Sequence, residues 1–139
     1  MNKRRFGIIG EKIAQNYLKN KGYEIIENNF YTKIGEIDII SKINNYIVFV
    51  EVKTRNNLEY GTPAMAVDLV KKRHIKNAAK IFLQINNLNN CIVRFDVVEI
   101  IIKDGKCKIN HIEGIMWNLT KKHHSEYNKQ EKEQSWKIY

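Results

Sequence analysis

Three charged residues stand inside two apolar stretches of the chain. Asp38 lies in an isoleucine-rich stretch at 35–40, and Glu51 and Lys53 lie in a valine-rich stretch at 47–55. Both stretches have the β-branched content of strands, and polar turn residues bound them. Because charge amid apolar side chains is unfavourable without a partner or a function, these three residues are the first candidates for chemistry.

Strand geometry brings the three side chains together. Successive side chains of a strand point to opposite faces, so Glu51 and Lys53 share one face. In the first stretch, the same alternation places Ile37 and Ile39 together on the face opposite Asp38. An Asn-Asn pair between the two stretches predicts a hairpin turn, and an antiparallel hairpin places Asp38 on the strand beside that of Glu51. We assume that the two acids lie on the same face of this hairpin.

Two neighbouring carboxylates and a lysine can form a site for the hydrolysis of phosphodiester bonds. Asp38 and Glu51 repel each other unless a cation bridges them, and oxygen ligands alone suit Mg²⁺ or Mn²⁺ rather than zinc. Lys53 adds a positive charge where a phosphoryl oxygen or an attacking hydroxide would sit. The alternative is an ordinary ion pair on an exposed strand, which a Glu-x-Lys pattern by itself describes equally well.

The composition indicates a soluble, basic, single-domain protein. The 139 residues are 43% hydrophobic and 28% charged, and 24 Lys and Arg against 15 Asp and Glu give a net charge of +9. A basic domain favours polyanionic partners, with nucleic acid ahead of an acidic membrane surface, although many soluble proteins are basic without such a role. No apolar run approaches the ~20 residues of a membrane span, no secretory signal opens the chain, and Cys91 and Cys107 lack metal-site spacing. We therefore expect a cytoplasmic protein that does not bind membranes.

The hydrophobic pattern of the chain predicts the helices and strands that position these residues. Helices are expected at 7–21 and 62–85, and strands at 23–31, 35–41, 47–55, 92–102 and 108–115. This order predicts an α/β fold with a small mixed sheet flanked by helices. We expect one domain at 1–116 and a polar, mobile C-terminal tail at 117–139.

The second expected helix has an apolar side and a basic side. Thr62 is a natural N-cap, and Pro63 suits the first helical position. The apolar stripe comprises Val67, Val70, Ile75, Ala78, Ala79, Phe82 and Leu83. The other side carries the cations Lys71, Lys72, Arg73, Lys76 and Lys80. Such a face is often only solvated, but five cations near a single acid are more one-sided than solubility requires.

Several short motifs occur together in the chain. They are Gly10-Glu11, Gly35-Glu36-Ile37-Asp38, Phe49-Val50-Glu51-Val52-Lys53 and Arg94-Phe95-Asp96-Val97-Val98. In this combination the chain resembles the YraN-type family of endonuclease-like proteins, within the PD-(D/E)xK nuclease superfamily, over about residues 7–115. The resemblance implies a restriction-endonuclease-like core with the order α-β-β-β-α-β. It favours a metal-dependent endonuclease that acts on DNA, including branched or flapped DNA.

The resemblance also implies roles for individual residues. Asp38 and Glu51 would hold Mg²⁺ or Mn²⁺ with help from the backbone carbonyl of Val52, and Lys53 is the motif lysine. Glu11 matches a glutamate on the first helix of the similar archaeal Holliday-junction resolvases, which makes it a further active-site candidate. The superfamily's proline before the motif aspartate is replaced by isoleucine in this chain.

Charge decides the expected role of the motif lysine. The neighbouring carboxylates and its high intrinsic pKa keep Lys53 protonated, so we expect it to position water and to stabilise the pentacovalent state rather than to act as general base. Arg55, Lys72 and Lys76 are candidate phosphate contacts. For Asp96 we expect a structural hydrogen bond to loop backbone. By analogy, a homodimer would suit an enzyme that cuts both strands of a duplex.

Two other functions fit the same sequence. A non-catalytic nucleic-acid-binding protein that retains the nuclease fold would carry the same charge, and its binding would weaken steeply with salt. A protein-interaction module could instead use the aromatic residues of the tail, among them Trp136 and Tyr139. Metal-dependent cleavage would distinguish the nuclease from both.

Overall fold

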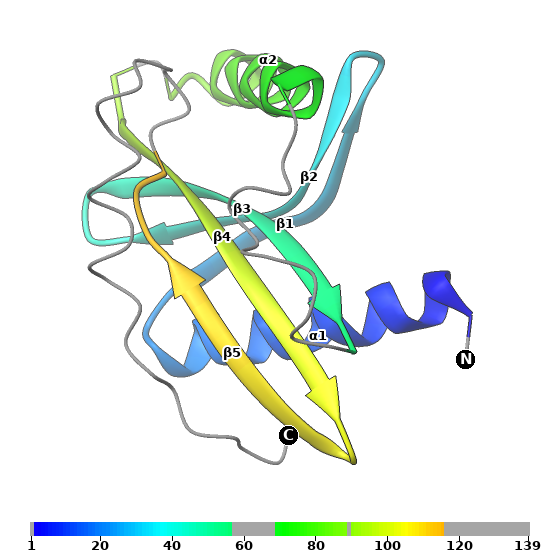
Figure 1. Cartoon of the computed structure of the whole chain (residues 1–139). Coiled ribbons are helices and arrows are strands. Elements are labelled where there is room, and N and C mark those ends of the chain that lie inside the picture. The colour runs from blue at the N-terminus through cyan, green and yellow to red at the C-terminus, as the bar shows by residue number, and fades with distance from the viewer. Residues whose placement is uncertain (1, 57–68, 89, 116–139) are drawn as a thin grey trace, which may run out of the picture.

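The computed structural model describes residues 2–56, 69–88 and 90–115. In chain order the elements are α1 (Lys3–Asn20), β1 (Glu24–Thr32), β2 (Gly35–Ile43), β3 (Tyr46–Arg55), α2 (Leu69–Ile85), β4 (Ile92–Lys103) and β5 (Lys106–Ile112) (Figure 1). The predicted order of helix, three strands, helix and two strands is confirmed. The expected helix start at Thr62 and Pro63 and the expected tail at 117–139 lie outside the described residues.

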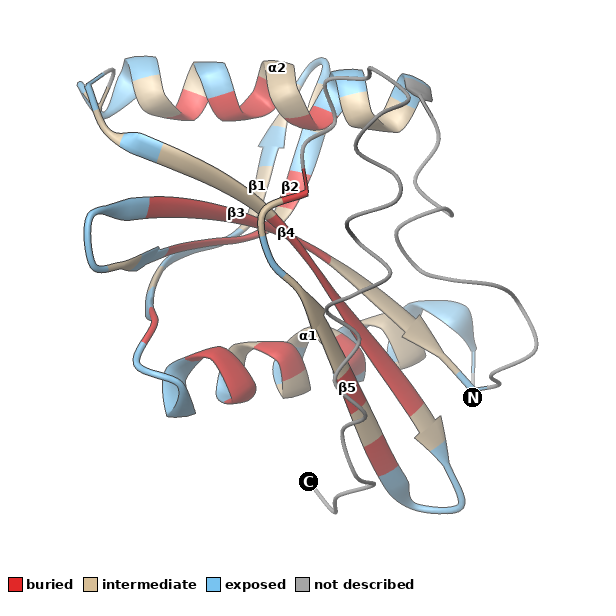
Figure 2. Ribbon diagram, turned by 60° about the vertical axis from the view of Figure 1, so that its left-hand side comes forward, coloured by how far each residue is buried: buried red, intermediate tan, exposed pale blue. Residues whose placement is uncertain are grey.

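One five-stranded sheet forms the centre of the molecule, in the order β1-β2-β3-β4-β5. β3 and β4 pair in parallel, whereas the other neighbouring strands are antiparallel. Antiparallel neighbours can be joined by short turns, while the parallel pair needs a longer crossover, and this crossover contains α2. The two helices lie on opposite sides of the sheet (Figure 2), so the predicted α/β fold with a small mixed sheet flanked by helices is confirmed.

Each helix covers its own hydrophobic cluster. Leu18 of α1 packs in one cluster with Val48 and Val50 of β3. Phe82 of α2 packs in the other with Phe49, and their ring centroids are 6.0 Å apart. Alternation along β3 therefore sends successive apolar side chains to opposite helices, as its sequence predicts.

α1 is longer than the sequence pattern indicated, and both of its ends are capped. The Asn2 side chain accepts a hydrogen bond from the Arg5 N–H at 2.9 Å, which starts the helix before its apolar periodicity begins. At the other end the Tyr23 N–H donates to the Leu18 carbonyl at 3.0 Å, and Gly22 adopts a φ of +93°. This is the Schellman arrangement, and it confirms the predicted stop at this glycine.

β2 bends at Asp38, and the predicted alternation fails there. Ile37 packs in the cluster under α2, whereas Ile39 packs in the cluster over α1. The prediction that these two side chains share a face is therefore wrong. On the neighbouring strand, Asn29 adopts a φ of +54°, and the regular pairing of β2 with β3 begins only at Ile39 and Val50. The acid thus stands at an irregular step of its strand, which periodicity alone does not reveal.

Two glycines allow the helices to approach the strands closely. A Cβ on Gly10 of α1 would lie 1.8 Å from Thr54 Oγ1 of β3. A Cβ on Gly35, at the start of β2, would lie 2.7 Å from the carbonyl oxygen of His74 in α2. Both glycines therefore fix the position of a helix against a strand, and the residue that follows Gly10 is the candidate Glu11.

Candidate active site

Asp38 lies where two strands separate. The Val52 N–H of β3 donates to the Asp38 Oδ2 at 2.8 Å. In the described residues, the pairing of β2 with β3 does not continue from Ile39 and Val50 toward this point. The carboxylate therefore takes the place of a main-chain acceptor on β2, and the diverging strands leave an opening beside it.

Glu51 lies next to this opening and is 3% exposed. Its Oε1 is 2.5 Å from the Lys71 Nζ of α2 and 3.8 Å from the Lys53 Nζ. The predicted face shared by Glu51 and Lys53 is present, because both side chains are on the side of the sheet that α2 covers. Two lysines from different elements thus compensate one buried carboxylate.

Three carboxylates lie close enough to influence one another. Loss of water contact raises the pKa of Asp38 well above its usual range, and the charge of Glu51 and a hydrogen bond with it raise the pKa further. Loss of water contact also raises the pKa of Glu11, against a hydrogen bond from the Asn29 side chain that lowers it, and the charges of Glu36 and Glu51 add to the rise. The prediction that crowded carboxylates raise a pKa here is borne out for Asp38.

The pKa values of Lys53 and Lys71 are shifted in opposite directions. Loss of water contact and the charge of Lys71 lower the pKa of Lys53, and the attraction of Glu51 does not fully offset them. The carboxylates therefore do not dominate the pKa of Lys53 as expected, because partial burial and the second lysine, Lys71, oppose them. For Lys71, loss of water contact lowers the pKa, but the charge of Glu51 and the hydrogen bond with it outweigh that effect, so its pKa is raised.

These groups line a cleft of about 470 Å³ between the N-terminal half of α1 and the start of α2. Its walls are formed by Lys3, Phe6, Gly7, Glu11, Asp38, Glu51, Val52, Lys53, Thr54, Arg55, Asn56 and Lys71. Every residue predicted to be catalytic or metal-binding is among them. The cleft joins side chains from α1, β2, β3 and α2, and therefore depends on the whole α/β arrangement.

A divalent cation fits the donors of this cleft. Within the described ranges, no three side chains of His, Cys, Asp or Glu converge as a metal cluster. Mg²⁺, however, commonly takes only one or two carboxylates and keeps several waters. Asp38 and Glu51 supply two such carboxylates in one cleft, and a cation between them would relieve the repulsion that adds to the effect of burial on the Asp38 pKa.

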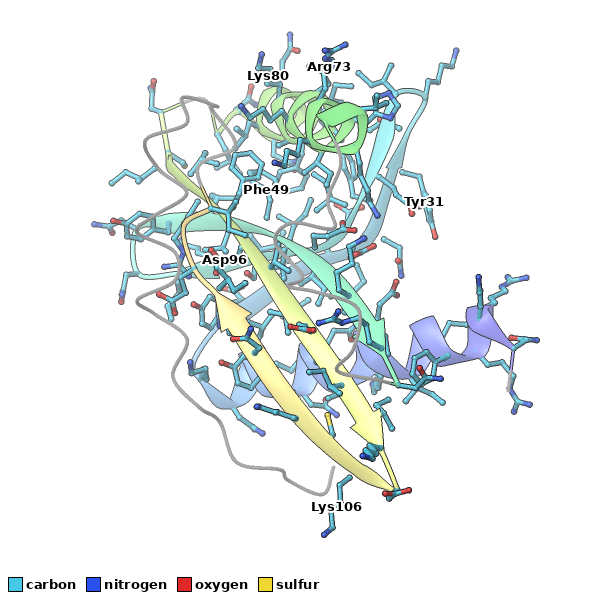
Figure 3. All side chains as sticks on the ribbon, in the orientation of Figure 1. Tyr31, Phe49, Arg73, Lys80, Asp96 and Lys106 are labelled. Atoms are coloured by element: carbon cyan, nitrogen blue, oxygen red, sulfur yellow. The ribbon has the colours of Figure 1, made fainter. Side chains whose placement is uncertain are left out.

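The three candidate phosphate contacts occupy different surroundings. Arg55 lines the cleft, and its guanidinium pairs with Glu99, which is 2% exposed. Lys72 and Lys76 lie one turn apart on α2, and the pKa of Lys76 is lowered by partial burial and then by the charges of Lys80 and Lys72. These lysines form a basic row outside the cleft lining. Figure 3 shows Lys80, in the same row, on the outer side of α2.

Lys71 is the site residue that the sequence analysis missed. The predicted apolar stripe of α2 included Val70, but Val70 is 57% exposed, so that part of the prediction is wrong. Lys71 instead stands four residues before the buried Ile75 and in phase with Ala78 and Phe82. A cation in phase with the core residues of a helix was the signal, because such a side chain points toward the sheet.

Asp96 belongs to a separate buried network. It accepts hydrogen bonds from Arg94 at 2.9 and 2.8 Å, from His111 at 2.7 Å and from the Gly114 N–H at 3.0 Å. Burial would raise its pKa, but the hydrogen bonds from His111 and Arg94 outweigh burial and lower it. The expected structural bond from Asp96 to loop backbone is confirmed by the bond from Gly114. Figure 3 shows the residue within the sheet region.

The chain matches known sequences over most of its length. The model of the uncharacterised protein family UPF0102 matches residues 10–100. A UPF0102 protein of Caldicellulosiruptor saccharolyticus is 49% identical over 116 residues, which cover 82% of this chain and 98% of the relative. One of Clostridioides difficile is 46% identical over 112 residues, covering 81% and 96%, and one of Acetivibrio thermocellus is 52% identical over 100 residues, covering 71% and 77%. The described helices include none with the length and apolarity to cross a membrane.

Proposed function

The chain belongs to the uncharacterised protein family UPF0102, and from its own site we propose that it is a metal-dependent nuclease that hydrolyses DNA phosphodiester bonds. One observation carries the proposal. The carboxyl groups of Asp38 and Glu51 line one cleft that also holds Lys53, and the charge of Glu51 is near enough to raise the pKa of Asp38. The family confirms the YraN-type resemblance, and membership of the PD-(D/E)xK superfamily is part of the proposal.

In the proposed reaction, different residues of the cleft hold the metal ion, orient the attacking water and stabilise the charge on the phosphate. Asp38 and Glu51 would hold Mg²⁺ or Mn²⁺, which when bound neutralises phosphate charge and activates water. The N–H and C=O of one strand residue point to the same neighbouring strand, so the Val52 carbonyl is expected on the same side as the N–H that Asp38 accepts. That placement supports the carbonyl as a third oxygen donor.

Lys53 and Glu11 are proposed to act on the reacting groups. The Lys53 ammonium lines the cleft and would donate to a phosphoryl oxygen as negative charge grows on it. Glu11 enters from α1, and we propose that its carboxylate orients the attacking water. In the reaction, water oxygen bonds to phosphorus, the bond from phosphorus to a sugar oxygen breaks, and that oxygen leaves with a proton.

Charge supports a polyanionic substrate. The net charge of +9 and the basic row of α2 favour nucleic acid, and we propose DNA, including branched or flapped DNA, as the substrate. We also propose that the protein is cytoplasmic, where Cys91 and Cys107 would remain free thiols. A homodimer would allow it to cut both strands of a duplex.

The test is cleavage of labelled single-stranded, duplex, flap and four-way-junction DNA with Mg²⁺, with Mn²⁺ and with EDTA. We expect metal-dependent cleavage of at least one substrate. Asp38→Asn and Lys53→Met should each lower its rate by about 10²–10³-fold, because each removes a charge that acts on the transition state.

Glu36→Gln provides the matched control. It removes a carboxylate from β2 two residues before Asp38, but Glu36 is exposed and outside the cleft lining, so cleavage should change little. No metal-dependent cleavage, combined with salt-sensitive DNA binding that Asp38→Asn leaves intact, would contradict the nuclease. That result would favour the non-catalytic nucleic-acid-binding protein instead.

A further inference from the structure

One oxygen of Glu51 attracts two ammonium groups. Lys71 Nζ is 2.5 Å from Oε1, and Lys53 Nζ is 3.8 Å from the same atom. A divalent cation ligated by Glu51 would repel both ammonium groups and compete with them for the lone pairs of the carboxylate. Metal binding at Glu51 therefore weakens the ion pair with the closer ammonium, that of Lys71, and favours its release.

Lys71 is the lysine that is placed to move. Its side chain is 42% exposed and reaches Glu51 from α2, across the cleft, whereas the Lys53 side chain is 24% exposed and extends from the same strand as Glu51. A lysine has a flexible four-carbon stem, so its ammonium can change partners without any movement of the helix. α2 itself is held, because Gly35 allows no space between β2 and the backbone of His74.

We propose that Lys71 couples metal binding to phosphate binding. In the metal-free protein its ammonium neutralises Glu51, and when a divalent cation occupies that carboxylate the ammonium turns to a phosphate oxygen of nucleic acid in the cleft. The inference rests on the proposed function, since both ligands belong to that site. Coupling of this kind is reciprocal, so DNA tightens metal binding by the same factor as the metal tightens DNA binding.

The experiment measures both affinities on the full chain without requiring cleavage. Mn²⁺ binding is followed by the electron paramagnetic resonance of the free ion. Binding of a short fluorescein-labelled DNA duplex and of the single strand is followed by anisotropy, with Ca²⁺ or with EDTA. For the wild type we expect the cation to tighten DNA binding by about 5- to 150-fold, the usual range of coupling between two sites.

Lys71→Met should separate the two ligands. Without DNA, the variant should bind Mn²⁺ several-fold more tightly than the wild type, because no ammonium competes for Glu51. Its DNA affinity should become nearly independent of the cation. Lys71→Arg, which keeps the charge, should retain part of the coupling. Lys106→Met removes an exposed cation at the start of β5, outside the cleft lining and the basic row of α2, and should leave Mn²⁺ binding and the coupling unchanged.

The outcomes distinguish this inference from the nuclease proposal. If Lys71→Met keeps wild-type Mn²⁺ affinity and wild-type coupling, Lys71 is not the coupling residue, whether or not the wild type cleaves DNA. If Asp38→Asn binds Mn²⁺ as the wild type does, the cation is not held in this cleft, and both the metal-dependent function and the coupling are overturned. Circular dichroism of each variant confirms that it is folded.

Discussion

Asp38 and Asp96 are aspartates withdrawn from water, yet their surroundings shift their pKa values in opposite directions. Burial and the nearby Glu51 raise the pKa of Asp38. Hydrogen bonds from His111 and Arg94 outweigh burial and lower the pKa of Asp96. The first aspartate is therefore a strained ionised group, and the second is a stabilising one.

Asp38→Asn should stabilise the metal-free protein at neutral pH. The folded-state pKa of Asp38 is raised, so wild-type stability falls as the pH rises from the unfolded value near 3.9 through the folded value. Asparagine avoids this fall and can still accept from the Val52 N–H. Denaturant unfolding in EDTA should show a gain of roughly 0.5–2 kcal/mol at about pH 7 that disappears toward about pH 3. A loss of stability at pH 7 would contradict the assignment of strain to this carboxylate.

Asp96→Asn is the contrasting variant and should behave in the opposite way. Because the folded pKa is lowered, the stabilisation is present above the unfolded value near 3.9 and is lost as the pH falls through the folded value. Leaving Arg94 without its carboxylate in a buried network should cost about 3–5 kcal/mol at neutral pH. The two variants measured side by side separate a functional carboxylate from a structural one.

At the residue scale, strand patterns predicted the acids better than the helix pattern predicted its lysine. Asp38 and Glu51 stood out because carboxylates interrupt apolar runs. Lys71 did not, because the predicted apolar stripe included Val70, whereas Lys71, four residues before the buried Ile75, is the residue in phase with it. Its partner, Glu51, lies across the cleft on β3, and that contact is tertiary, so the helix pattern does not reveal it.

The elements that carry the site are positioned by close contacts that a side chain would block. Gly10 lets α1 approach β3 at Thr54. Gly35 lets β2 approach α2 at His74. α1 carries Glu11, and α2 carries Lys71. The positions of α1 and α2, which form two sides of the cleft, therefore each depend on one glycine at which there is no room for a Cβ.

Gly10→Ala and Gly7→Ala should shift stability in opposite directions. An added Cβ at Gly10 would lie 1.8 Å from Thr54 Oγ1 and 2.7 Å from Thr54 Cβ, so helix or strand must move, at a cost of about 1–3 kcal/mol. At Gly7, in the same helix, nothing lies within 4 Å, and alanine should stabilise the helix by roughly 0.5–1 kcal/mol. Thermal unfolding of the two variants checks both signs. Equal effects would show that the contact with Thr54 does not restrict α1.

At the element scale, the sequence predicted the order and type of every described helix and strand, but not their local irregularities. Capping by Asn2 starts α1 four residues before the predicted start at position 7. The bend at Asp38 breaks the alternation that strand periodicity assumes. Both departures depend on local hydrogen bonds and on neighbouring strands, to which a hydrophobic pattern is insensitive.

Charge at the scale of the whole molecule is distributed unevenly among the described elements. The row formed by Lys72, Lys76 and Lys80 lies on α2, next to the helix wall of the cleft. Figure 3 shows Lys106, at the turn between β4 and β5, at the opposite end of the molecule from Lys80. A polyanion that enters the cleft would therefore pass the α2 row rather than the distant turn.

Lys72→Gln and Lys76→Gln should each weaken DNA binding and reduce its salt dependence. Removal of one phosphate contact lowers the slope of log affinity against log salt by about 0.9. Lys106→Gln removes the same charge far from α2, and its slope should stay at the wild-type value. The measurement is anisotropy of labelled DNA over a series of salt concentrations. If all three variants gave the same slope of log affinity against log salt, the DNA would not bind along Lys72 and Lys76 of α2.

The separation of β2 and β3 has a consequence for solubility. Where the strands diverge, each has an edge that no described strand pairs, along 35–38 of β2 and along 51–55 of β3. Unpaired edges can add a strand from another molecule and so start aggregation. In this protein charged side chains occupy both edges, including Glu36 and Lys53, and charge is a common means by which proteins prevent such pairing. Lys53, which is proposed to act in catalysis, would thus also hinder pairing between molecules, and apolar replacements of charged edge residues, such as Asp38→Val, would confuse lost activity with self-association.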